Sequence, residues 1–198
     1  MSYCAYEIKI PNLEELKQEW REYWPDQPQT FQGSIYVNHK TVGPETIKLY
    51  EFFDNCFLDN MRFVKVGPGI NYTMHMDIDV DKKDYFDGEI PFSSIRKATI
   101  NILLGEPDVN KTQWWVDLKA TKQDWDNHYN YKDKEWKLID ECQLTETPML
   151  INTGQWHSIK YTKERWMVGL HFHPLTSFIG AIEYCKHKGL LIERESNV

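Results

Sequence analysis

The sequence lacks the features that define several large protein classes. No apolar run approaches the roughly 20 residues that a membrane helix requires, so we expect no membrane span. The segment 1–7 has neither a basic start nor an apolar stretch, which favours a cytoplasmic over a secreted protein. The cysteines form no close pair such as CxxC, and we expect reduced thiols rather than a disulfide framework. These thiols belong to Cys4, Cys56, Cys142 and Cys185.

Positive charge is also scarce. The 198 residues carry 23 Lys and Arg against 30 Asp and Glu, a formal net charge of −7. General nucleic-acid binding needs clustered basic side chains that neutralise phosphates, so the composition argues against it. The composition does not exclude a small molecule, a nucleobase or a peptide side chain as the substrate. The composition gives no indication of an oligomeric state.

Linkers and repeats are absent as well. No internal repeat and no Gly/Ser-rich or Pro-rich segment divides the chain, which predicts one domain over 1–198. Hydrophobic residues make up 41% of it, enough for a substantial core. Within this domain we expect an N-terminal strand and helices in 1–60, a β core in 61–173, and a C-terminal helix and tail in 174–198.

Helical patterns occur near both ends of the chain. After a short strand at about 3–10, Asn12 and Glu15 have the spacing of a capping box, which predicts a helix starting there. Pro44 suits the first position of a second helix, which we expect to run to about Leu58. A last helix is predicted over about 175–188, because basic residues at its end precede a glycine.

From residue 61 the sequence pattern changes to short β-type runs separated by turn signals. Several short strands at this spacing favour a sandwich or barrel. The polar stretch Lys119–Lys134 is expected to be a long excursion, the kind of loop that often forms a lid. The predicted strands are 62–66, 70–80, 94–104, 113–118, 135–140, 147–152, 157–161 and 165–172.

The strand 70–80 contains the first chemically informative motif. Alternate side chains of a strand share a face, so Thr73, His75, Asp77 and Asp79 lie on one side of it. The His-x-Asp pair places an imidazole and a carboxylate within reach of one metal ion, although an exposed strand shows the same alternation. Two imidazoles and one carboxylate are the set that a mononuclear non-haem Fe(II) site uses.

His157 is the candidate for the second imidazole. It follows an apolar strand and a turn that deliver it to the start of the next strand. Arg165 then opens the following strand, where a buried guanidinium needs an anionic partner. The far carboxylate of an oxo acid is one such partner. A surface ion pair of Arg165 with Glu164 or Asp77 is the alternative.

These motifs together resemble those of a known enzyme family. The run Gly67–Asp77 is similar to the PGG-x-Y-x-x-H-x-D stretch of Fe(II)/2-oxoglutarate-dependent oxygenases of the prolyl-hydroxylase-like and aspartyl-hydroxylase-like kind. The segments Leu150–Ile159 and Arg165–Leu170 resemble the second half of the same core. The resemblance covers about residues 61–172. It implies a mainly β fold with flanking helices, the double-stranded β-helix (jelly roll, cupin-like).

The resemblance also implies the site residues and the chemistry. The implied ligands of Fe(II) are His75, Asp77 and His157, and the implied pocket for 2-oxoglutarate contains Arg165, Tyr72 and Asn101. Such a dioxygenase consumes O2, releases succinate and CO2, and most often acts as a hydroxylase. Tyr72 lies three residues before His75, so it reaches the pocket only if the strand twists or bulges. Met167 stands where several subfamilies carry a hydroxyl.

Two other interpretations remain open. The chain could be a non-enzymatic jelly-roll module for binding or structure. It could also be a cupin-type metalloenzyme that uses His171 and His173, with His187 as a third ligand. Because Pro174 follows directly, a pair of partly buried, hydrogen-bonded histidines is the simpler interpretation of the two imidazoles. No motif names the primary substrate.

Overall fold

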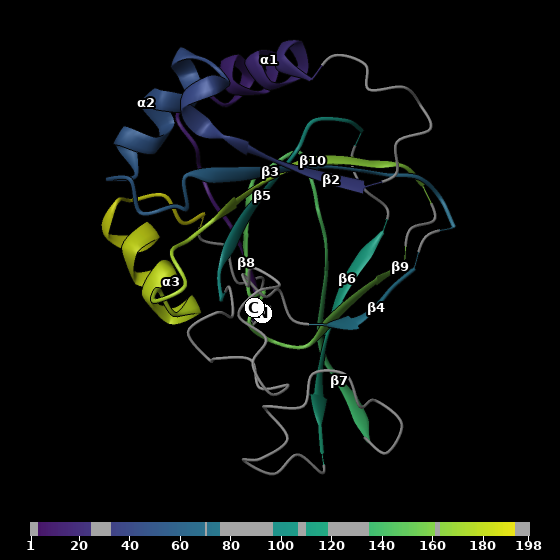
Figure 1. The fold of residues 1–198 in the computed structure, drawn as a ribbon. Helices are drawn as coiled ribbons and strands as arrows, with labels where there is room; N and C mark the ends of the chain where they lie inside the picture. The colour runs from purple at the N-terminus through teal and green to yellow at the C-terminus, as the bar shows by residue number, and fades with distance from the viewer. Residues whose placement is uncertain are drawn as a thin grey trace, which may run out of the picture.

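Two antiparallel sheets face each other, and helices cover the outer side of the larger one (Figure 1). The computed structural model describes residues 4–24, 33–69, 71–75, 97–106, 110–118, 135–160 and 163–192, with only the backbone given for 71–75 and 160. The predicted excursion Lys119–Lys134 lies outside these residues. The described part is mainly β, as the sequence predicts.

The larger sheet has six strands in the order β1-β8-β5-β10-β3-β2. The bounds of its strands are Ala5–Glu7 (β1), Gly33–Asn38 (β2), Asn60–Val66 (β3), Thr99–Leu103 (β5), Met149–Ile151 (β8) and Arg165–His171 (β10). The smaller sheet has the order β4-β9-β6-β7. The bounds of its strands are Asn71–His75 (β4), Lys111–Asp117 (β6), Trp136–Gln143 (β7) and His157–Lys160 (β9). All eight strands predicted after residue 61 are present in part or whole, and the portions predicted at 70, 76–80, 94–96 and 161 lie outside the described residues.

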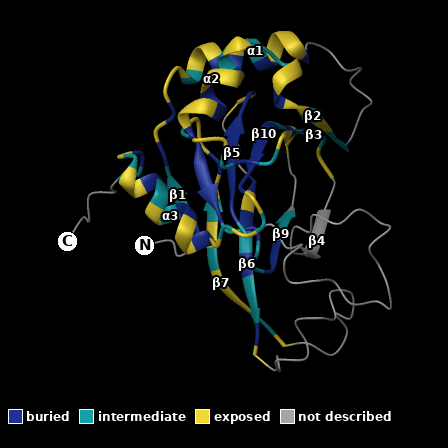
Figure 2. Ribbon diagram, turned by 60° about the vertical axis from the view of Figure 1, so that its left-hand side comes forward, coloured by how far each residue is buried: buried dark blue, intermediate teal, exposed yellow. Residues whose placement is uncertain are grey.

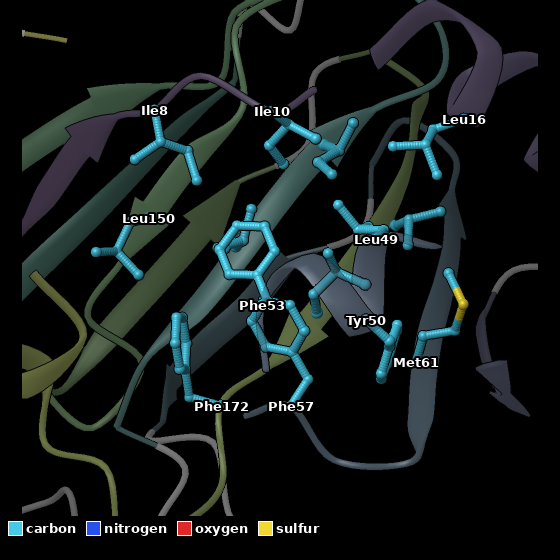
Figure 3. Close-up of a cluster of buried hydrophobic side chains, with 14 of the residues drawn as sticks. Ile8, Ile10, Leu16, Leu49, Tyr50, Phe53, Phe57, Met61, Leu150 and Phe172 are labelled. Atoms are coloured by element: carbon cyan, nitrogen blue, oxygen red, sulfur yellow. The ribbon is translucent and has the colours of Figure 1, made fainter. Parts of the chain in front are cut away.

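The main core lies between the helices and the larger sheet. Helices α1 (Leu13–Tyr23), α2 (Pro44–Phe52) and α3 (Phe178–His187) bury their apolar sides there, and a short 3-10 helix, His39–Thr41, precedes α2. Figure 3 shows part of this core, with Leu16 of α1 and Leu49 of α2 in one cluster with strand residues such as Leu150. The outer sides of α1 and α2 are exposed, whereas the central strands are buried (Figure 2).

A second apolar cluster fills part of the space between the two sheets. Val64 and Met167 of the larger sheet meet Trp114 of the smaller one there. Alternation along β10 explains the division, because Val168 and Leu170 belong to the helix-side core and Met167 faces the other sheet. Polar side chains at the same parity as Met167 therefore point into the interior between the sheets.

The predicted helix starts and ends need correction at two places. Asn12 has a φ of 51° and makes no side-chain cap, so the capping box predicted with Glu15 is wrong. The second helix ends at Phe52 rather than near Leu58, because Asp54 and Asn55 take left-handed backbone with φ of 51° and 52°.

Other differences concern the last helix and one strand. The last helix begins at Phe178, three residues later than predicted, where Ser177 accepts a hydrogen bond from the Gly180 amide. Strand β2 was not expected, and it extends the larger sheet beyond β3. The four cysteines are free, as predicted. No helix in the described ranges has the length and apolar character to cross a membrane.

Candidate site between the two sheets

Polar side chains gather on the inner face of the larger sheet. Arg165 and His171 on β10 have the same parity as Met167, and Thr99 and Asn101 on the neighbouring strand β5 have the parity of Leu103. All four polar side chains are buried. The sequence places them there by period-two alternation, since their intervening neighbours carry the apolar groups of the helix-side core.

His157 occupies the facing position on the smaller sheet. Its side chain is 3% exposed, and its Nδ1 lies 2.9 Å from the carbonyl oxygen of Gln155. A carbonyl only accepts, so Nδ1 donates this hydrogen bond, and in the neutral imidazole Nε2 is then the nitrogen with a lone pair. Histidines that bind metals are commonly oriented by this kind of hydrogen bond from the other ring nitrogen. The neutral tautomer that this hydrogen bond selects is the one in which Nε2 can bind a metal.

The backbone register brings residue 75 to residue 157. Strands β4 and β9 are antiparallel, and His75 is the direct partner of His157 across the pair. The Cα atoms of such partners lie about 4.5–5.5 Å apart. The two histidine positions predicted from distant parts of the sequence are thus adjacent.

A bulge in β4 affects the position of residue 72, which was predicted to line the pocket. The register pairs residue 72 with Ile159 and residue 75 with His157, so β4 has one extra residue between these two pairs. Ile159 and His157 share the inner face of β9, and the bulge therefore sets positions 72 and 75 opposite residues of the same face. A bulge was the condition under which the sequence allowed Tyr72 to reach the pocket.

The third predicted ligand lies outside the described residues. Asp77 follows the end of β4, and Asp79 also falls in that undescribed segment. Within the described ranges no group of three His, Cys, Asp or Glu side chains forms a metal site. Two of the three predicted ligands, residues 75 and 77, have no described side chain, so this absence does not bear on the predicted ligand set.

Arg165 is buried at the start of β10. Its side chain is 1% exposed, and its Nη2 lies 3.5 Å from the carbonyl oxygen of Asn110. The alternative of a surface pair with Glu164 does not hold, because the Glu164 carboxylate lies 3.8 Å from Lys65 Nζ instead. A guanidinium inside the sandwich presents a fork of donors that matches a carboxylate.

Two buried polar atoms of this interior have no hydrogen-bond partner among the described residues. They are Asn101 Oδ1 on the larger sheet and Thr112 Oγ1 on the smaller sheet. Leaving a buried polar atom unpaired costs about 1–3 kcal/mol, so each is a candidate contact for a bound polar molecule. An amide such as that of Asn101 offers either a donor or an acceptor.

The rival pair His171 and His173 separates in the structure. His171 is buried and its Nδ1 lies 2.9 Å from Thr99 Oγ1. His173 is exposed beyond the end of β10, and its Nδ1 accepts from the Leu175 amide at 3.4 Å. Of the pair, only His171 lies in the interior, which does not suit joint chelation of one ion.

Two residues of this interior were not singled out from the sequence. Trp114 is the cross-strand partner of His157 on its other side and is fully buried, with Nε1 donating to the Asn152 carbonyl at 2.7 Å. Gly169 is the partner of Asn101, and a Cβ there would meet Asn101 Oδ1 at 3.4 Å. A glycine in a buried strand was the available signal, because it marks close approach or a hollow.

The comparisons identify the fold. No family model matches the sequence, and no curated protein matches it. One similar structure is SnoK, a non-haem α-ketoglutarate-dependent carbocyclase from nogalamycin biosynthesis. The match covers 85% of this chain and 78% of SnoK, with a TM-score of 0.51 and 10% sequence identity. Another is SnoN, a non-haem α-ketoglutarate-dependent epimerase from nogalamycin biosynthesis. The match covers 85% of this chain and 77% of SnoN, again with a TM-score of 0.51 and 10% sequence identity. The chain therefore has the double-stranded β-helix fold of such enzymes.

Proposed function

We propose that this protein is an Fe(II)- and 2-oxoglutarate-dependent oxygenase, most simply a hydroxylase of a small molecule or a peptide side chain. The observation that supports it most is the register that sets residue 75 opposite residue 157, with Arg165 buried on the facing sheet. The fold shared with SnoK and SnoN is consistent with it.

The donor set fits the metal. His75, Asp77 and His157 would hold the ion, and the Gln155 carbonyl would keep His157 in the ligating tautomer. Trp114, buried beside His157, would exclude water and limit rotation of the imidazole. Three ligands on one face leave positions for a co-substrate and O2.

The described residues also fit the co-substrate. Arg165 would pair with the distal carboxylate of 2-oxoglutarate, and Asn101 Oδ1 and Thr112 Oγ1 are buried atoms that still need partners. Tyr72 would add a further contact through the bulged strand. When bound, iron and 2-oxoglutarate supply, with O2, the oxidising power for attack on a C–H bond, with release of succinate and CO2. The chain's residues position these groups and keep the pocket dry.

The test is formation of succinate from 2-oxoglutarate by the purified protein with Fe(II). We expect His157→Ala to reduce turnover to background, because the metal loses one of its two imidazoles. His173→Ala is the matched control and should leave turnover unchanged, since that imidazole is exposed beyond the strand. Succinate formation that survives in His157→Ala would refute the ligand assignment.

A binding measurement separates the enzyme from a non-enzymatic module. Mn(II) with N-oxalylglycine, a 2-oxoglutarate analogue, should raise the unfolding temperature of the wild type. Arg165→Lys should weaken N-oxalylglycine about tenfold or more, because an ammonium lacks the fork that matches a carboxylate. A wild type that shows no thermal shift would favour the binding or structural module.

A further inference from the structure

A second guanidinium lies on the inner face of the larger sheet, on strand β3. Arg62 alternates with Val64 and Val66, which belong to the cluster between the sheets. Its Nε is buried without a hydrogen-bond partner in the described part of the chain. The notable contact of its side chain is with an aromatic ring, since Cζ lies 5.9 Å from the ring centroid of Tyr36. No carboxylate of the described residues pairs with it.

Arg62 belongs to a row that crosses the sheet. The register pairs Tyr36 with Arg62, Arg62 with Gly169, and Gly169 with Asn101, so these four positions form one line on the inner face. The ring of His171 lies 6.5 Å from that of Tyr36, which confirms that Tyr36 faces the same side. Tyr36 is 51% exposed and marks the open end of the row.

Gly169 makes the row concave. A Cβ at that position would lie 3.4 Å from Asn101 Oδ1, 3.5 Å from Thr99 Cγ2 and 3.6 Å from His171 Cε1, so the missing side chain leaves a hollow the size of a methyl group between these three side chains. Arg62 borders the hollow on one side and Asn101, with its unpaired oxygen, on the other. The hollow thus lies between the Arg62 cation and the unpaired amide oxygen of Asn101, and Tyr36 lies beyond Arg62 at the exposed end of the row.

The row lies at the same level along the strands as the proposed metal ligands. Residues 67–70 connect β3 to β4. Arg62 is the fifth residue before this connection, and His75 is the fifth residue after it. Gly169 is the fifth residue of β10 and His157 the fourth residue from the end of β9, whereas Arg165 is the first residue of β10. A co-substrate that is held by Arg165 and reaches Asn101 would therefore still leave Tyr36, Arg62 and Gly169 of the row free.

We infer that the primary substrate carries a carboxylate that binds Arg62 over Gly169, with its apolar part against Tyr36. This rests on the proposed function. A single guanidinium whose Nε edge is unpaired offers two parallel donors, which match the two oxygens of one carboxylate. A phosphate dianion usually recruits more than one cation, and Arg62 is the one unpaired cation of this row in the described residues.

Benzoate is a suitable probe, because it combines a carboxylate with a ring. Its binding would be titrated by NMR on the full chain loaded with Mn(II) and N-oxalylglycine, so that Arg165 is occupied. We expect saturable binding to the wild type and an affinity about tenfold to a hundredfold lower for Arg62→Met, the effect of losing a charged hydrogen-bond pair. Lys65→Met, on the same strand but on the helix side, is the matched control and should bind benzoate as the wild type does.

Gly169→Ala tests the hollow without changing a charge. Its Cβ meets its neighbours at van der Waals distance, so the variant should fold and yet bind benzoate more weakly. Wild-type affinity in either Arg62→Met or Gly169→Ala, absence of saturable benzoate binding, or preferential binding of inorganic phosphate would overturn the inference. Binding of N-oxalylglycine depends on Arg165 and tests the proposed function, whereas binding of benzoate depends on Arg62 and tests the substrate carboxylate. A failure of one proposal can therefore be told from a failure of the other.

Discussion

Thr46 is a buried residue whose hydroxyl serves two side chains of α1. Trp20 Nε1 donates to Thr46 Oγ1 at 2.7 Å, and the hydroxyl donates to Glu19 Oε1 at 2.6 Å. Thr46→Val keeps the shape of the side chain but leaves the buried indole N–H without an acceptor. We expect the free energy of unfolding to fall by about 1–3 kcal/mol, measured by urea denaturation.

The matched control is Thr41→Val. Thr41 is exposed, and its hydroxyl donates to the Asn38 carbonyl at 2.8 Å, a bond that water can replace. We expect a change within about 0.5 kcal/mol there. Equal losses in the two variants would show that the buried bond between Trp20 and Thr46 is not what stabilises the contact of α1 and α2.

Single residues differ in how far the sequence could predict them. The parity of Arg165 within an apolar strand predicts its burial, and the structure confirms it. His75 and His157 lie far apart in the sequence, and only strand pairing makes them neighbours. Arg62 could not be singled out, because alternation gives two faces but not which one faces the other sheet.

At the scale of elements, the N-terminus of α3 depends on one hydroxyl. Ser177 Oγ accepts from the Gly180 amide at 3.0 Å, one of the amides that a helix start leaves without a partner. Ser177→Ala should lower the free energy of unfolding by about 1 kcal/mol. Ser177→Asp, which keeps an acceptor, is the control, and a loss as large as that of alanine would exclude capping as the cause.

Element boundaries were predicted less well than element types. Helix α2 continues in pattern through Cys56 and Phe57, but Asn55 takes left-handed backbone and Phe57 bridges to Phe172 of the sheet, so tertiary pairing overrides helical periodicity. Strand β2 was missed because it lies at the sheet edge with mixed exposure and no clear alternation. The cap of α2 also comes from outside it, since Glu19 accepts from the amide of Thr46 at 2.8 Å.

At the scale of the whole molecule, the three α-helices of the described residues lie on one side of the larger sheet, so the interior between the sheets is left to the candidate site (Figure 1). The sequence predicted this architecture through its strands and its family resemblance. It could not predict which helix contacts which. Asp54, beyond the end of α2, joins that helix to α3, because its Oδ2 lies 2.8 Å from the Tyr184 hydroxyl and 2.9 Å from Lys188 Nζ.

This connection makes stability depend on pH. The hydrogen bond from Lys188, and then that from Tyr184, hold the pKa of the Asp54 carboxyl below its ordinary 3.8. A carboxyl whose pKa is lowered by folding stabilises the folded state above its unfolded pKa, and the stabilisation is lost as the pH falls through the folded pKa. The contribution should therefore be complete at neutral pH and absent in strong acid.

Asp54→Asn isolates the charge, because asparagine also tolerates the left-handed backbone at this position. We expect the variant to unfold at a lower temperature than the wild type at neutral pH, with the difference shrinking below about pH 4 and vanishing in stronger acid. The measurement is a series of thermal denaturation curves across that range at low salt. A difference that stays constant through the acid range would mean that the carboxylate does not join α2 to α3 by its charge.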